Sequence, residues 1–277
     1  MKEVLAFLKK TPLVTGILAL GLTVGGILFV HTEGLFFAGL YRFILAFATG
    51  AFLYLISKER TFEKSTLKSL GYTFKHLLAF VIFSFSLGVM LFFYYMSYQK
   101  CPVNPTWYLE VIFTAFFCLG VGIFEELIFR AVLNDAIICQ FRKSKCVFVV
   151  AAIVPSFIFG YVHVIQEDIT NPELLLPIAL KTLSTGLMGV ALTFLYWKTR
   201  NIIGVAIVHA VYDFFPIVPT MIFQSGQELG NYASSADGKG QPVVWYVVQI
   251  VLEAVVLICL WKKVVKTIDF KKMREEW

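Results

Sequence analysis

Long apolar segments separated by short polar ones dominate the pattern along the chain. A helix that spans a membrane needs about 20 mostly apolar residues, and eight segments of the sequence reach this length. The connections between them carry residues typical of loops, as in 101–105 and 225–242. The pattern therefore predicts an all-α polytopic membrane protein with about eight transmembrane helices. The predicted spans are residues 12–30, 35–56, 75–98, 107–128, 146–164, 174–197, 202–222 and 243–262.

The amino-acid composition supports this interpretation. Hydrophobic residues make up 58% of the 277 residues and charged residues 15%, whereas soluble domains have about 45–50% apolar and about 25% charged residues. These values argue against a water-soluble globular protein and against a disordered chain. The first apolar segment resembles a secretory signal, but it extends from Pro12 to Val30 without a clear A-x-A cleavage site. We therefore expect an uncleaved first membrane helix.

The positively charged residues predict how the chain is oriented in the membrane. If the eight segments alternate across the bilayer, 19 of the 24 Lys and Arg residues lie on one side. Only Lys100 and Lys239 lie on the other side. Because cytoplasmic loops carry an excess of Lys and Arg, both termini are predicted to be cytoplasmic. This skew accounts for the formal net charge of +6 without nucleic acid as a partner. The prediction is one integral membrane domain over residues 1–277, located in a bacterial cell membrane.

A few ionisable residues fall inside the predicted spans and form three groups. A charge at the centre of a bilayer costs about 2.5–3.5 kcal/mol, so each such residue is a candidate for a functional site. A single group has a structural explanation, as a hydrogen bond between helices or a side chain that reaches the interface. Three groups together favour a functional site. They are Glu125, Glu126 and Arg130; His163; and His209 and Asp213.

Helical spacing distinguishes the roles of these residues. Glu126 and Arg130 are four residues apart with the acid first, which favours an ion pair on one helix face. Glu125 lies about 140° from Arg130 around an α-helix. We therefore expect Glu126 to pair with Arg130 and Glu125 to remain available for chemistry. His209 and Asp213 are also four residues apart, so the carboxylate can orient the imidazole or share a ligand with it.

The remaining intramembrane charges are expected to be structural or have no assigned role. Arg42, Glu110 and Lys181 lie within reach of an interface or pair locally. Glu253 lies about halfway along the last predicted span, and nothing in the sequence indicates what it does.

The groups resemble the motifs of a known family, the CAAX protease and bacteriocin-processing family of intramembrane proteases, which includes the CAAX prenyl protease 2 type enzymes. Three motifs carry the resemblance, in this order on successive hydrophobic segments. They are Glu125-Glu126-x-x-x-Arg130, Phe159-x-x-x-His163 and His209-x-x-x-Asp213. The resemblance covers about residues 107–215, the motif-bearing core of the chain.

The resemblance implies a proteolytic core of eight helices around an intramembrane active site. By this resemblance Glu125 and His163 would activate the attacking water, supported by Glu126, Arg130 and Phe159. His209 and Asp213 would hold the scissile carbonyl or a metal. The family often has Asn where this chain has Asp213, and an ionised Asp cannot donate the hydrogen bond that an amide donates. Asp213 therefore is protonated, only orients His209, or is a ligand.

The need for a metal stays open at the level of the sequence. Glu125, His163, His209 and Asp213 supply a mixed set of N and O donors that suits Zn²⁺, but the chain lacks the H-E-x-x-H signature. A metal-free mechanism fits these residues equally well, and we favour water activation by Glu125 and His163.

The predicted function is that of an intramembrane endopeptidase. Its substrate would be a membrane-associated or lipidated peptide, such as a prenylated CaaX tail, a peptide pheromone or a bacteriocin leader. One alternative is a non-catalytic membrane regulator or bacteriocin-immunity protein. A second is a proton-coupled or cation-coupled transporter, which the lack of an internal repeat disfavours.

Overall fold

The structure is a computed structural model that describes residues 2–30, 32–57, 66–224 and 243–276. The predicted loop 225–242, with Lys239, lies outside the described residues. All elements that the structure describes are helices, and one isolated antiparallel bridge joins Val103 and Phe223. The predicted all-α class is confirmed.

Contacts divide the chain into two compact units, and the motif-bearing core contributes to both. The α8 unit comprises Met1–Val24, Phe129–Arg200 and Glu228–Trp277, and the α9 unit comprises Gly25–Ile128 and Asn201–Gln227. Helix α2 (Pro12–Phe29) and the π-helix η3 (Leu127–Asn134) each have residues in both units. The α9 unit also contains α3 (Gly34–Ser57), α4 (Leu67–Phe93), η2 (Tyr94–Tyr98), α5 (Trp107–Glu126) and α9 (Ile202–Ile222). The α8 unit also contains α1 (Lys2–Lys10), α6 (Asp135–Phe141), α7 (Val147–Val162), α8 (Pro172–Thr199), α10 (Val243–Lys263), η4 (Val265–Thr267) and α11 (Phe270–Glu276).

Seven of the described helical segments are long and apolar enough to cross a membrane. The predicted span at 146–164 corresponds to α7, which has only 16 residues. At about 1.5 Å per residue this helix is roughly 24 Å long, less than the roughly 30 Å of a hydrocarbon core. The predicted count of eight is therefore not confirmed, whereas a polytopic membrane protein is. The seven segments are Pro12–Phe29, Gly34–Ile56, Leu67–Tyr98, Trp107–Phe141, Pro172–Thr199, Ile202–Ile222 and Val243–Thr267.

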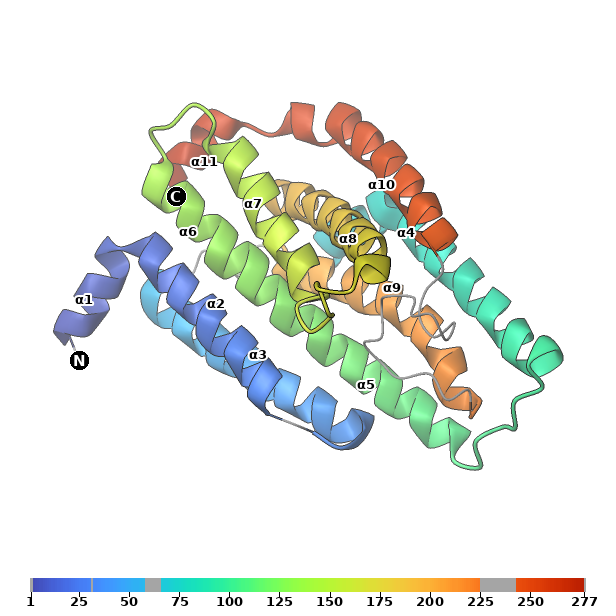
Figure 1. Cartoon of the computed structure of the whole chain (residues 1–277). Helices are drawn as coiled ribbons and strands as arrows, with labels where there is room; N and C mark the ends of the chain where they lie inside the picture. The colour runs from blue at the N-terminus through green and yellow to red at the C-terminus, as the bar shows by residue number, and fades with distance from the viewer. Residues whose placement is uncertain (1, 31, 58–65, 225–242, 277) are drawn as a thin grey trace. The chain divides into compact units, whose positions relative to one another are not determined.

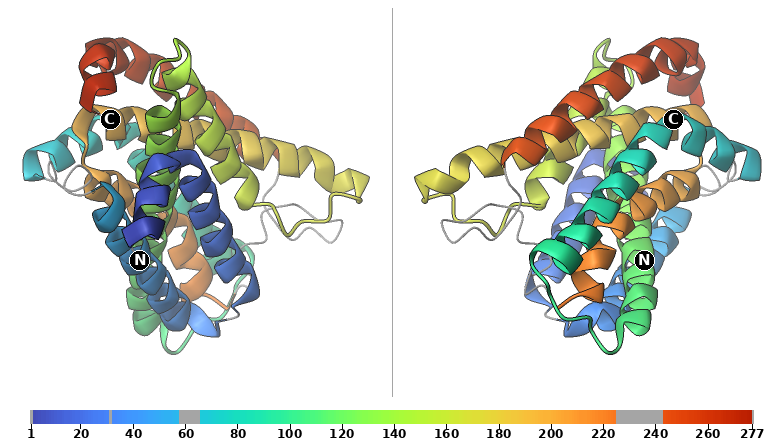
Figure 2. Two further views of the ribbon diagram at one scale, coloured as in Figure 1. Left: turned by 90° about the vertical axis from the view of Figure 1, so that its left-hand side faces the viewer. Right: turned by 90° about the vertical axis from the view of Figure 1, so that its right-hand side faces the viewer.

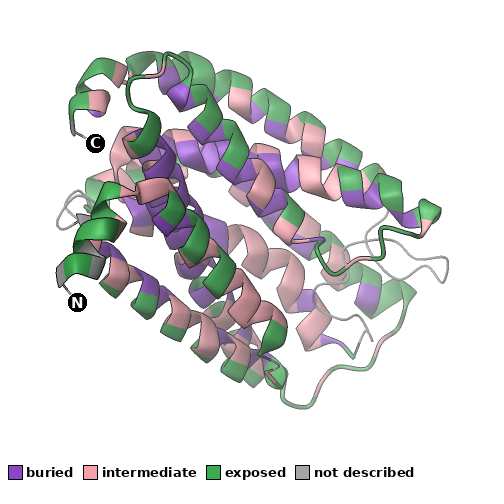
Figure 3. Ribbon diagram, turned by 60° about the vertical axis from the view of Figure 1, so that its left-hand side comes forward, coloured by how far each residue is buried: buried purple, intermediate pink, exposed green. Residues whose placement is uncertain are grey.

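Many of the exposed positions on the helices, which are green in Figure 3, carry large apolar side chains. Leu22, Phe29 and Phe47 are 77%, 85% and 80% exposed, respectively. Such faces are unfavourable in water but match lipid tails, which are as apolar as these side chains. The exposed Trp107 and Tyr108 at the start of α5 are typical of the aromatic residues that lie at a membrane interface.

Within the α9 unit, α9 lies between α4 and α5, and α5 also packs against α3 (Figures 1 and 2). Within the α8 unit, α8 packs against both α7 and α10. Each central helix begins with an asparagine cap. The side chain of Asn171 accepts from the backbone N–H of Glu173 at the start of α8, and that of Asn201 accepts from the N–H of Gly204 at the start of α9. These caps define where α8 and α9 begin, and thereby the positions of the polar residues along them.

Candidate active site

His209 of α9 lies among three carboxyl groups inside the α9 unit. Its Nδ1 is 2.9 Å from Oε1 of Glu126. Its Nε2 is 3.4 Å from Oδ2 of Asp213 and 3.7 Å from Oε2 of Glu125. Both Nε2 distances exceed the length of a normal N–H···O hydrogen bond, about 2.7–3.2 Å. The imidazole is thus oriented mainly from its Nδ1 side by Glu126.

Exposure separates the three carboxyl groups into two kinds. The Glu126 side chain is 0% exposed and that of His209 is 3% exposed. The side chains of Glu125 and Asp213 are 17% and 30% exposed. The Glu125 and Asp213 end of the cluster is therefore the less buried one, although Oε2 of Glu125, which faces His209, is itself buried.

A glycine allows α5 and α9 to approach closely enough for these contacts. Gly122 lies one turn before Glu126, and a Cβ atom there would be 2.5 Å from the backbone oxygen of Ala206 and 3.1 Å from the backbone nitrogen of Ala210. No side chain larger than hydrogen fits at this distance. Ala206 and Ala210 are themselves small and flank His209, and small residues spaced by four are typical of close helix contacts in membranes.

Two prolines, Pro216 and Pro219, lie inside α9 just after Asp213. Pro216 has no N–H, so it cannot donate to the carbonyl of Tyr212 as a helical residue normally would. The hydroxyl of Ser84 on α4 donates to that carbonyl instead. One turn further along α4, Gly88 lies so close to Phe215 that a Cβ atom would be 2.5 Å from the Phe215 oxygen. These contacts hold α4 against the part of α9 that follows Asp213.

The helix that carries Glu125 and Glu126 changes its geometry immediately after them. Helix α5 ends at Glu126, and Leu127–Asn134 form the π-helix η3, in which hydrogen bonds join residues five apart rather than four. The α-helical spacing that pairs Glu126 with Arg130 therefore does not continue to Arg130, and that pairing stays a prediction. Turns of π-helix occur frequently at functional sites.

Arg130, Phe159 and His163 form a second group, inside the α8 unit. The Arg130 guanidinium lies 4.6 Å from the centroid of the Phe159 ring and donates to the carbonyl of Gly189 at 3.3 Å. The rings of Phe159 and His163 are 4.7 Å apart at an angle of 79°. Arg130 is 1% exposed and Phe159 is 1% exposed, so this stack is buried.

His163 directly follows the last residue of α7 and is its C-cap. The contact of its imidazole ring with the backbone carbonyl of Phe159 indicates which ring nitrogen carries the proton. Nδ1 lies 2.8 Å from the carbonyl oxygen of Phe159, one of the last carbonyls of the helix, which have no intrahelical donor. A carbonyl oxygen only accepts hydrogen bonds, so Nδ1 carries the proton and Nε2 is the basic nitrogen of neutral His163.

The structure describes all the site residues that the sequence indicates and distributes them over the two units. The contact between His209 and Asp213 agrees with their spacing, whereas the contact between His209 and Glu126 and the role of Gly122 were missed. The small residues Ala206 and Ala210 were a usable signal for Gly122. The α9 unit brings together Glu125, Glu126, His209 and Asp213, and the α8 unit brings together Arg130, Phe159 and His163.

The arrangement does not support a zinc site. Within the described ranges, no three or more His, Cys, Asp or Glu side chains are grouped so that they could hold a metal ion. Both ring nitrogens of His209 already face carboxyl oxygens. No step proposed below involves a metal.

Comparison with known proteins finds one family that is similar to part of the chain. Residues 106–215, less than half of the chain, match the family model described as Rce1-like, type II CAAX prenyl endopeptidase. No curated protein and no solved structure matches the chain. The matched segment contains both groups of polar residues described above and agrees with the resemblance expected from the three motifs. This segment is therefore similar to the CAAX protease family of intramembrane endopeptidases.

Proposed function

We propose that this protein hydrolyses a peptide bond in a lipidated, membrane-associated peptide and that Glu125 is the general base. The observation that carries the proposal is the cluster around His209. Of its two glutamates, Glu125 is on the accessible side and Glu126 is fully buried. A water molecule can therefore contact Glu125, while Glu126 orients the imidazole as the carboxylate of a catalytic triad does.

The proposed reaction needs only groups of this chain and one water molecule. Glu125 takes a proton from the water as the water oxygen bonds to the scissile carbonyl carbon; the family resemblance makes His163 a second candidate for this step. The carbonyl oxygen becomes an oxyanion, and protonated His209 donates to it from Nε2. The C–N bond then breaks, and Glu125 returns the proton to the leaving amine. In this scheme Asp213 helps to keep His209 protonated, so it does not need to act as the amide donor that Asn provides in the family.

Cleavage by the purified protein tests this proposal. We expect the protein in detergent or liposomes to cut a prenylated CaaX-type peptide, giving two products whose summed mass exceeds that of the substrate by one water molecule. We also expect full activity after treatment with a chelator. Failure to cut any prenylated, pheromone or leader peptide would contradict the peptidase proposal, and loss of activity that Zn²⁺ restores would contradict the metal-free mechanism.

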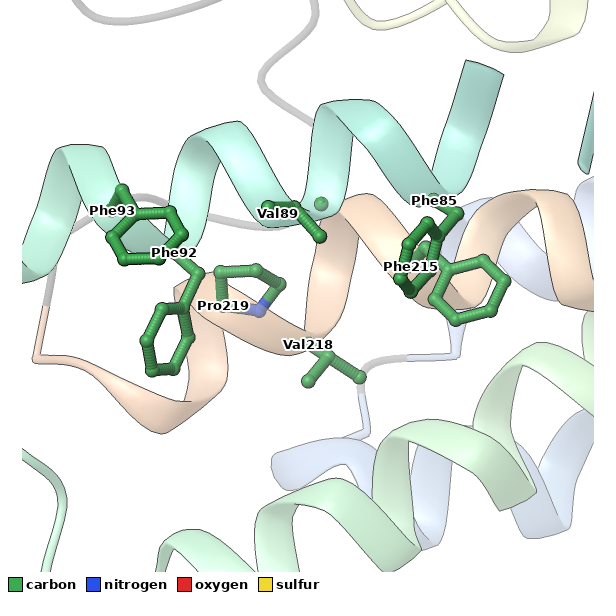
Figure 4. A pocket seen from close by; sticks show the side chains of 8 residues that line it. Phe85, Val89, Phe92, Phe93, Phe215, Val218 and Pro219 are labelled. Carbon is green, nitrogen blue, oxygen red and sulfur yellow. The ribbon is translucent and has the colours of Figure 1, made fainter. Parts of the chain in front are cut away.

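An apolar groove in the same α9 unit supports a lipidated substrate. It has a volume of about 270 Å³ and lies between α4 and α9, beginning two residues after Asp213 (Figure 4). Because the lipid tails of the bilayer are as apolar as the groove, the groove would orient the lipid group of the substrate but add little to its binding affinity. An apolar chain in it would lie between α4 and α9. The lining residues are Phe85, Gly88, Val89, Phe92, Phe93, Phe215, Val218 and Pro219.

Filling this groove is expected to affect lipidated substrates selectively. Val218→Trp should lower kcat/KM for a prenylated peptide about tenfold more than for the same peptide without the lipid, because only the former needs the groove. Ile112→Trp, at a position that is 60% exposed on α5, is the control and should leave the ratio unchanged. An equal loss for both peptides in Val218→Trp would show that the groove does not select the lipid.

A further inference from the structure

A second buried polar cluster lies inside the α8 unit, between α8 and α10. Ser184 of α8 donates its hydroxyl to Oε1 of Glu253 at 3.0 Å, and the same Oγ is 3.5 Å from Oε1 of Gln249. The three residues are 3%, 2% and 8% exposed, in that order. None of them takes part in the reaction proposed above. The cluster is thus a separate feature that the peptidase does not explain.

Glu253 occupies an unfavourable position for a carboxyl group. It is the eleventh of the 21 residues of α10, the middle of a candidate membrane span. A carboxylate there is costly unless a positive charge or several donors compensate it. Its Oε2 atom is buried and has no hydrogen-bond partner among the residues that the structure describes.

The cluster contains more oxygen acceptors than donors. Ser184 has a single O–H, and at 3.0 Å that hydrogen goes to Glu253 rather than to Gln249. The oxygens of Ser184, Gln249 and Glu253 therefore lie close together, and the amide nitrogen of Gln249 carries the remaining two hydrogens of the cluster. Lys181, one turn before Ser184 on α8, acts on Glu253 electrostatically. Its ammonium group is the competitor that any test of this cluster has to address.

We propose that Ser184, Gln249 and Glu253 bind a monovalent metal cation, such as Na⁺, that links α8 to α10. Oxygen atoms of carboxyl, amide and hydroxyl groups are the ligands that hard cations prefer. The single carboxylate balances only one positive charge, so the cation would replace Lys181 as its counter-ion, and a divalent ion would leave an uncompensated charge in the membrane. Binding would compensate the charge of the buried Glu253 carboxylate and stabilise the α8 unit, independently of peptide hydrolysis.

Thermal unfolding of the purified full-length protein tests the cation site. In NaCl, the unfolding midpoint should lie about 4 °C or more above that in choline chloride of equal ionic strength, with a saturable dependence on Na⁺. Radioactive ²²Na⁺ should bind with a stoichiometry of one per chain. The Na⁺-dependent shift of the midpoint and the binding of ²²Na⁺ should both be lost in Glu253→Gln. In Ser184→Ala, the affinity for Na⁺ should fall at least tenfold.

Three further measurements distinguish a bound cation from a lysine counter-ion and from a protonated acid. Glu173→Gln, which removes an exposed carboxylate from the first turn of the same α8, should keep the Na⁺ response. Lys181→Met should bind Na⁺ more tightly, because a competing positive charge is removed. If this variant were instead destabilised equally in all salts, Lys181 itself would be the counter-ion of Glu253, and the proposal would be overturned. An identical midpoint for the wild-type protein in NaCl, KCl and choline chloride would also overturn it, since Glu253 would then be a protonated acid.

Discussion

Replacing Glu125 by glutamine is expected to lower kcat for a prenylated reporter peptide by about 10³-fold while KM changes little. Glutamine preserves the size of the side chain but cannot take a proton from water, and general base catalysis contributes about 10²–10⁴-fold. Because Glu125 is only partly buried, the variant should fold normally. Steady-state kinetics of the purified variant, with its unfolding midpoint measured in parallel, provides the check.

Two companion variants separate the base from the residues that assist it. If Glu125 and His163 activate the same water, the double variant Glu125→Gln/His163→Ala should be no slower than the worse single variant, because the two groups act as a unit. Glu126→Gln should reduce kcat and shift its pH profile, since Glu126 acts on His209 through the 2.9 Å contact with Nδ1.

Full cellular activity of Glu125→Gln and His163→Ala would contradict catalysis and favour the non-catalytic regulator. A proton flux in liposomes that depended on Glu125 would favour the transporter.

Gly122→Ala should be strongly damaging, although Gly122 has no chemical role. A Cβ atom at Gly122 would be 2.5 Å from a backbone oxygen of α9, so α5 and α9 would have to separate. Overpacking of this kind costs about 1–3 kcal/mol, and separation would also move Glu125 and Glu126 away from His209. We expect a lower unfolding midpoint together with a loss of kcat of about 10²-fold, since small misplacements of catalytic groups have effects of this size.

Gly71→Ala in α4 of the same unit is the matched control. No atom lies within 4 Å of the Cβ position at Gly71, and alanine in a helix is more stable than glycine by about 0.5–1 kcal/mol. This variant should be as active as the wild-type protein and equally or more stable. Equal effects of the two substitutions would show that the close approach of α5 and α9 is not needed.

Much of the fold and part of the site followed from local patterns in the sequence. Apolar segments long enough to span a bilayer predicted the helices, because a membrane forces the backbone to form its hydrogen bonds within each segment. The spacing of His209 and Asp213 predicted their contact, since residues four apart lie on one face of an α-helix. The same argument was less secure for Glu126 and Arg130, because the π-helix η3 begins between them. Spacing rules hold only where the helix stays regular.

The sequence by itself determined the all-α membrane class and the order of the candidate catalytic residues along the chain, because periodicity and hydrophobicity are local properties. Only the tertiary structure decided which of these residues meet. Glu126 reaches His209 across 83 residues of sequence and Ser184 reaches Glu253 across 69, and α7 has 16 residues where a longer span was expected. The contact between Glu126 and His209 depends on how closely two helices approach. That distance is set by the small residues Gly122, Ala206 and Ala210, whose effect appears only when the helices are packed together.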